Sequence, residues 1–153
     1  MIMKIPVEIM VTNKRLDYRE IHTLSDAVDP KETIDSFSGF METNGKSFVI
    51  EYTEDYDGFN DLETSVIYEN GMALISRRGE INTNLVFVPK SSCDCVYYSG
   101  YRQLSLRVTT KELVTDIGAL GGKLKIDYTV DIMGNMAEQN TICLSVCPIE
   151  SVS

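Results

Sequence analysis

Residues 123–132 read KLKIDYTVDI, and within this stretch every even-numbered residue is apolar and every odd-numbered one is polar. Successive side chains of a β-strand point to opposite faces, so this alternation predicts a strand with one face in a core and the other in water. Residues 5–11 and 142–146 show the same alternation. The chain is therefore predicted to consist mainly of strands that bury one face.

Two Asn-Gly pairs separate strand-like runs, at Asn44-Gly45 and Asn70-Gly71. Both residue types tolerate the positive φ angles of a type I′ turn, so each pair predicts a β-hairpin. The first hairpin is predicted to join residues 33–43 to 47–54, and the second to join 62–69 to 72–78. Further strands are expected at 83–88, 96–98, 103–117, 123–133 and around 142–146.

The strand expected at residues 103–117 contains a change of parity. Leu104, Leu106 and Val108 are apolar at even positions, whereas Leu113 and Ile117 are apolar at odd positions. A one-residue β-bulge around residues 110–112 produces such a shift.

These strands follow one another through short reversals, which predicts an all-β antiparallel meander. A long meander must close or split, because open edges invite aggregation and twisted sheets curl. We therefore predict one domain over residues 1–153, folded as a closed β-barrel of about eight to ten strands. The irregular, charged segment 13–30 is expected to be a long surface loop.

Composition narrows the classes of partner. The net charge is −9, with 14 Lys and Arg against 23 Asp and Glu, which argues against binding nucleic acid. No apolar run approaches the roughly 20 residues that span a bilayer, and residues 1–11 do not resemble a signal peptide, so we expect a cytoplasmic protein without a membrane partner. The cysteine spacings Cys93-x-Cys95 and Cys143-x-x-x-Cys147 match neither a zinc site nor a redox C-x-x-C pair, and free thiols are expected.

Between Thr33 and Val146, several short sequence elements have an order and spacing that are also found in a bacterial protein family. They include Gly39-Phe40, Tyr52-Thr53-Glu54, Thr64, Arg77-Arg78-Gly79, 85–87, 104–110, 122–128 and Asn140. In this order the chain resembles the YwiB-like bacterial proteins, an uncharacterised family. The resemblance implies a calycin-type, lipocalin-like β-barrel and no particular activity. Lys90 stands where that family commonly has a glycine, and residues 99–102 replace a Thr-Pro-Tyr-Gly turn, keeping only the tyrosine.

The sequence offers little support for catalysis or metal binding. His22 is the only histidine, lies in the irregular segment and is expected to be an exposed loop residue. The acidic segment 54–63 lacks the offsets of a calcium-binding loop and is expected to be a solvated hairpin loop. We therefore predict neither an enzyme nor a cofactor nor a metal site.

The candidate ligand-binding residues are polar side chains that alternation places among apolar ones, namely Tyr52, Glu54, Thr64, Arg77 and Tyr128. Because a buried charge is costly unless it is paired, an Arg-Glu pair inside the barrel either closes one end as a structural ion pair or receives a polar ligand. Alternation requires Arg77 or Arg78 to face inward, and the sequence leaves open which of them does.

Two functions are consistent with a barrel of this composition. The first is non-catalytic binding of a small, partly apolar molecule at the mouth of the barrel, whose interior is just wide enough to be filled or to hold one ligand. The alternative is a structural or protein-interaction module with a solid core. A cavity of a few hundred Å³ beside Arg77 would favour the first. The sequence predicts neither the ligand nor the oligomeric state.

Overall fold

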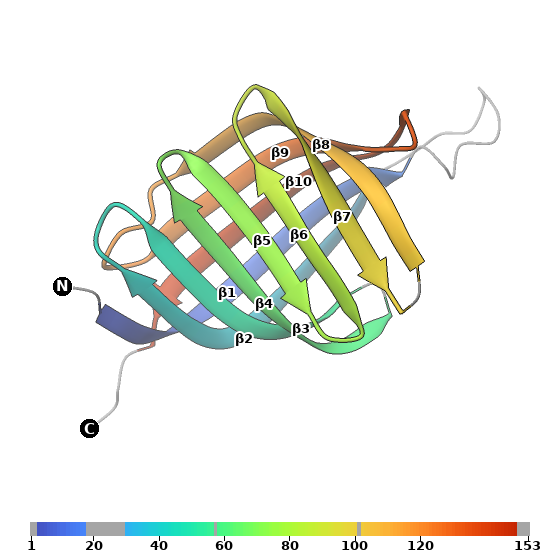
Figure 1. Cartoon of the computed structure of the whole chain (residues 1–153). Coiled ribbons are helices and arrows are strands. Elements are labelled where there is room, and N and C mark those ends of the chain that lie inside the picture. Colours follow the sequence, from blue (N-terminus) through green and yellow to red (C-terminus); the bar gives the residue numbers. More distant parts are fainter. Residues whose placement is uncertain (1–2, 18–29, 57, 101, 150–153) are drawn as a thin grey trace.

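The computed structural model describes residues 3–17, 30–56, 58–100 and 102–149, which form ten antiparallel strands. Each strand pairs with its neighbours in the chain, and β1 pairs with β10 to close the barrel (Figure 1). The predicted all-β antiparallel barrel is therefore confirmed. The strands are β1 (Met3–Asp17), β2 (Lys31–Thr43), β3 (Phe48–Tyr56), β4 (Phe59–Glu69), β5 (Met72–Arg78), β6 (Ile81–Phe87), β7 (Ser91–Ser99), β8 (Arg102–Thr115), β9 (Gly122–Ile132) and β10 (Asn135–Pro148).

Both predicted Asn-Gly hairpins are present, but they use different turns. Asn70 and Gly71 both have positive φ, 53° and 78°, and form a two-residue turn between Glu69 and Met72, as a type I′ turn requires. In the first hairpin, residues 44–47 form a four-residue loop in which the Asn44 side chain accepts hydrogen bonds from the backbone N–H groups of Lys46 and Ser47. The type I′ prediction is therefore wrong for that loop, because the asparagine side chain caps it instead.

The predicted bulge is confirmed in β8. The β8–β9 register shifts between Thr110 and Glu112, after which the inward-facing positions change from even to odd numbers. The shift keeps Val108 on one side of it and Ile117 on the other directed into the same core.

Two segments predicted as loops are strands. Residues 13–17 continue β1, so the expected loop 13–30 is wrong for this part. All five residues pair with β10, and residues 13–15 pair with β2 as well. These ladders outweigh the polar composition of the segment. Likewise, the acidic segment 54–63 lies almost entirely in β3 and β4, and Glu54 is buried rather than solvated. Residues 18–29, including His22, lie outside the described residues.

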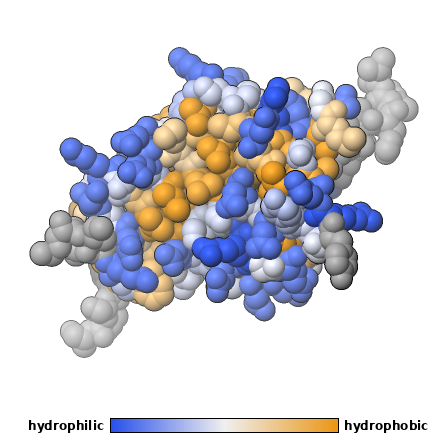
Figure 2. All heavy atoms as spheres, viewed as in Figure 1, coloured by the Kyte–Doolittle hydropathy of each residue, from blue (hydrophilic) through white to orange (hydrophobic). Residues whose placement is uncertain are grey.

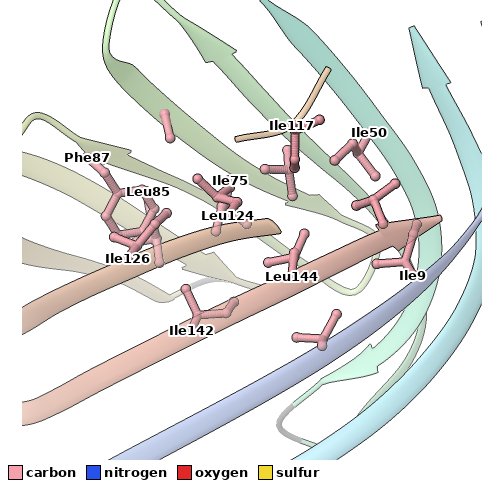
Figure 3. Close-up of a cluster of buried hydrophobic side chains, with 14 of the residues drawn as sticks. Ile9, Ile50, Ile75, Leu85, Phe87, Ile117, Leu124, Ile126, Ile142 and Leu144 are labelled. Atoms are coloured by element: carbon pink, nitrogen blue, oxygen red, sulfur yellow. The ribbon is translucent and has the colours of Figure 1, made fainter. Parts of the chain in front are cut away.

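Buried apolar side chains fill one end of the barrel. Figure 3 shows side chains such as Ile9, Ile50, Ile75 and Leu144 meeting from opposite walls. Ile117, from the β8–β9 connection, lies over this cluster and is only 8% exposed. Apart from Thr43, which is the partner of Phe48, the buried polar residues lie toward the other end, where β3 and β5 finish and β6 begins.

None of the residues described by the structure forms a helix long and apolar enough to cross a membrane.

Strands β2 and β3 approach each other closely at Gly39 in β2. A Cβ atom at Gly39 would lie 2.1 Å from the backbone oxygen of Glu51 and 3.0 Å from the Cβ of Tyr52. Beyond this point β2 no longer pairs with β3, since the β2–β3 ladder runs only from Phe40 to Thr43. Gly39 thus allows β2 to cross closely over β3.

We expect Gly39→Ala to lower the free energy of unfolding by about 2 kcal/mol or more, because backbone atoms block the added methyl group. Urea unfolding measures the effect. Gly118→Ala is the control, since its Cβ would meet nothing within 4 Å. Equal stability of the two variants would contradict the close approach of β2 to β3.

Candidate ligand-binding site

A row of polar side chains crosses the inner wall of β3 to β6. Tyr52 is the cross-strand partner of Thr64, Thr64 of Arg77, and Arg77 of Thr83. All four side chains are buried. Arg78, the next residue along β5, is exposed on the outer face, so Arg77 is the arginine that faces the interior.

Glu54 neutralises Arg77 within this wall. The Nε group of Arg77 donates a 2.7 Å hydrogen bond to Glu54 Oε1, and the Thr64 hydroxyl donates a 2.8 Å hydrogen bond to the same oxygen. The two charged side chains are only 6% and 7% exposed. Charge-assisted hydrogen bonds at this burial fix the side chains in place, and removing one partner would leave an uncompensated buried charge.

A second polar row lies on the wall formed by β8, β9, β10 and β1. Tyr128 is the cross-strand partner of both Thr110 and Asn140, and Asn140 is in turn the partner of Arg15. The Nε atom of Arg15 lies 3.0 Å from Glu138 Oε1, which forms a second Arg-Glu ion pair. Each wall of the barrel therefore carries one arginine with its own carboxylate.

Tyr56 joins the two walls. Its ring lies under the Arg77 guanidinium, with 3.9 Å between Cζ and the ring centroid, and its hydroxyl accepts a 3.2 Å hydrogen bond from Arg15 Nη2. A continuous network thus runs from Glu138 through Arg15, Tyr56 and Arg77 to Glu54.

This network borders a cavity of about 530 Å³ at the polar end of the barrel. Arg77, Thr83 and Tyr128 contribute to its polar side. Its apolar side is lined by Leu85, Leu104, Leu106, Val130 and Ile132. Pockets of this size and mixed polarity are typical sites for small molecules.

Thr83 contributes an unpaired hydroxyl to the lining of the cavity. Its side chain is 4% exposed, and none of the described residues forms a hydrogen bond with its hydroxyl. An unpaired buried hydroxyl is costly, and such groups in native proteins call for an explanation.

The comparisons with known proteins agree with this fold. Residues 20–144 match the family described as "Domain of unknown function (DUF1934)". The chain belongs to this family. It is 25% identical over 95 residues to the "Uncharacterized beta-barrel protein YwiB" of Bacillus subtilis (strain 168), an alignment that covers 62% of this chain and 66% of that protein, just under two thirds of its length.

The crystal structure of the ywiB protein from Bacillus subtilis has the same fold. It superposes with a TM-score of 0.73 at 21% identity and covers 93% of this chain and 92% of that one. The sequence resemblance to YwiB-like barrels is therefore confirmed. The likeness to this structure supports the fold of the DUF1934 barrel and not a particular activity.

The structure brings together most of the predicted site residues of this DUF1934 barrel. Glu54, Thr64 and Arg77 form one hydrogen-bonded cluster, and Tyr52 lies next to Thr64 in the same row. Tyr128 is on the opposite wall and lines the same cavity as Arg77. Tyr52, Glu54 and Thr64 are not among the residues that line the cavity. Glu54, which also accepts a hydrogen bond from Thr64, positions Arg77, whereas the Tyr52 ring stacks on Phe37.

Sequence reasoning missed six polar residues that line the cavity, which are Arg15, Tyr56, Thr83, Tyr97, Glu138 and Asn140. Tyr56 lies two residues beyond Glu54, outside the predicted strand 47–54, and the observed strand β3 extends to include it. Thr83 and Asn140 become recognisable only once the strand register is known. Among the described residues, no group of three or more His, Cys, Asp or Glu side chains is placed to hold a metal ion.

Burial shapes the electrostatics of the site. It raises the pKa values of Tyr52 and Tyr128 above their usual range, so both hydroxyls stay protonated near neutral pH. Burial opposes the charge on Arg77, but Tyr56 and Glu54 outweigh this effect and raise its pKa, so the guanidinium stays charged.

The raised pKa values of Tyr52 and Tyr128 predict that the protein becomes less stable at alkaline pH. Folding raises the pKa values of both tyrosines above about 10, the value in the unfolded chain. The contribution of each protonated tyrosine to the free energy of unfolding is therefore complete below about pH 10 and is lost as the pH rises above that value. We expect denaturant unfolding at about pH 11 to show a loss of about 1 kcal/mol per tyrosine relative to pH 8. Tyr128→Phe should lose less stability over this range than the unmodified protein, and an equal loss would contradict the burial of the Tyr128 hydroxyl.

Proposed function

We propose that this DUF1934 barrel binds a small, partly apolar molecule in the cavity at its polar end and does not catalyse a reaction. The cavity of about 530 Å³ beside Arg77 carries this proposal. A barrel that served only as a solid scaffold would fill this space with side chains, as it does around Ile75 and Leu144 at the other end. The polar network supplies fixed groups for orientation, and the leucine and valine side chains supply apolar contact area.

We further propose that the protein works in the cytoplasm. All four cysteines lie in the described part of the chain and have free thiols, which is typical of a reducing compartment.

A second candidate function rests on the outer surface. Val49, Ile67, Leu74 and Val86 are successive cross-strand partners on β3 to β6 and form an apolar row that faces outward. Figure 2 shows apolar side chains gathered over these strands. This row favours a protein-interaction module. The cavity favours ligand binding more strongly, because the row is only partly exposed whereas the cavity leaves Thr83 without a partner among the described residues.

A thermal-shift screen against a metabolite library tests the ligand-binding proposal. A compound that binds only the folded barrel must raise its melting temperature, by an amount set by its concentration relative to Kd. Val130→Phe, which places a ring in the cavity, should abolish the shift, and Leu106→Phe is a second cavity-filling variant in case the first misfolds. Val49→Phe on the outer face should preserve it. The proposal is wrong if hits shift all three variants equally or if no compound in a broad library produces a shift.

A further inference from the structure

The hydrogen-bonding groups of the cavity identify the class of ligand. Resting on the proposed function, we propose that the ligand is an amphiphilic carboxylate whose head group binds Arg77 and Thr83. Its apolar part lies against the wall formed by Leu85, Leu104, Leu106, Val130 and Ile132.

The polar side of the cavity has more donors than acceptors. Among the described residues, the Arg77 guanidinium has one hydrogen bond, from Nε to Glu54, while its side chain lines the cavity. The planar guanidinium carries five N–H donors and no acceptor, so the Nη groups are available to a ligand. Thr83 and the protonated hydroxyl of Tyr128 add further donors to the same space. A group with two acceptor oxygens suits this arrangement, and Arg77 can bind it through two parallel hydrogen bonds.

Both Arg-Glu pairs of the network have their carboxylates already engaged. Glu54 Oε1 accepts hydrogen bonds from Arg77 and Thr64, and Glu138 lies against Arg15. A cationic ligand would therefore meet two arginines, each of which already holds the carboxylate beside it. Glu138 lines the cavity, but it is paired with Arg15, so a cation there would compete with that arginine and would also be repelled by Arg77.

The two threonines on either side of Arg77 differ in their hydrogen bonding. Thr64 and Thr83 are both direct cross-strand partners of Arg77, on β4 and β6. Thr64 donates to Glu54, whereas the Thr83 hydroxyl has no partner among the described residues and lines the cavity. The Thr110 hydroxyl is likewise buried without a partner among the described residues, but Thr110 does not line the cavity. Thr83 is therefore the unpaired hydroxyl that a ligand in the cavity can reach.

The apolar side of the cavity accounts for the rest of the ligand. Its leucine, valine and isoleucine side chains come from β6, β8 and β9, and it lies beside the donor groups rather than around them. A ligand that is polar throughout would leave this wall without apolar contact. The class that satisfies both sides has one acceptor head group and a hydrocarbon chain or ring.

Three probes with the same hydrocarbon chain test the head group by isothermal titration calorimetry. They are decanoate, decanamide and decylamine, which carry a carboxylate, a neutral head group of the same shape and a cation. We expect decanoate to bind at least about tenfold more tightly than decanamide, as charge-assisted hydrogen bonds imply, and decylamine not to bind. Equal affinity for decanoate and decanamide would overturn the proposal.

Thr83→Val tests the hydroxyl while keeping the side-chain shape. We expect it to weaken decanoate binding about five- to tenfold, and Thr53→Val on the outer face to leave it unchanged. Without ligand, Thr83→Val should melt at or above the temperature of the unmodified protein, whereas Thr64→Val should melt about 2–4 °C lower, because it removes a hydrogen bond from Glu54. Unchanged decanoate affinity in Thr83→Val, or a melting temperature as low as that of Thr64→Val, would show that the hydroxyl has a structural role instead.

The binding results distinguish a wrong carboxylate assignment from a wrong proposed function. If only the carboxylate assignment is wrong, decanamide binds as well as decanoate and Val130→Phe still blocks both. If the cavity does not bind amphiphiles at all, none of the three probes binds, or Val130→Phe leaves their affinities unchanged.

Discussion

Side-chain alternation along ten paired strands determines what the interior of this barrel must contain. Once the ladder closes from β1 to β10, every second residue must enter the same interior, whatever its chemistry. Apolar residues fill one end of that interior. At the other end alternation carries Arg77, Glu54 and Tyr128 inside, and the protein must satisfy them there.

The cost of buried charge explains how the polar end is organised. Arg77 is held by Glu54 and Arg15 by Glu138, and Tyr56 lies between the two arginines. The Arg77–Glu54 pair resists repacking, because breaking it leaves a charge in a low-dielectric interior, and the more exposed Arg15–Glu138 pair extends the network toward solvent. The network therefore holds its residues at the walls, and the space between them stays open as the cavity beside Thr83.

Local patterns in the sequence predict most of the fold. Alternation identified the strands, the parity change placed the bulge at residues 110–112, and Asn70-Gly71 formed the expected turn. Lys90, at the family's usual glycine position, has a positive φ of 60°, so the backbone keeps a glycine-like conformation there. The end of β1 was missed because its polar residues owe their strand conformation to two neighbouring strands rather than to their own pattern.

The site was only partly predictable, for a related reason. Burial of Tyr52, Glu54, Thr64, Arg77 and Tyr128 follows from alternation within single strands. The contact between Arg77 and Thr83, and the choice of Arg77 over Arg78, depend on the register between strands. Register is a non-local property, and residues that are far apart in sequence, such as Arg15 and Tyr56, meet only after the barrel closes. A crystal structure of the protein with decanoate would show whether the polar end of the barrel is a binding site for an amphiphilic carboxylate. We expect the carboxylate within hydrogen-bonding distance of the Arg77 Nη groups and the Thr83 hydroxyl, with the hydrocarbon chain against Leu104 and Val130. Decanoate bound only on the outer surface, or with its head group turned away from Arg77, would refute this assignment.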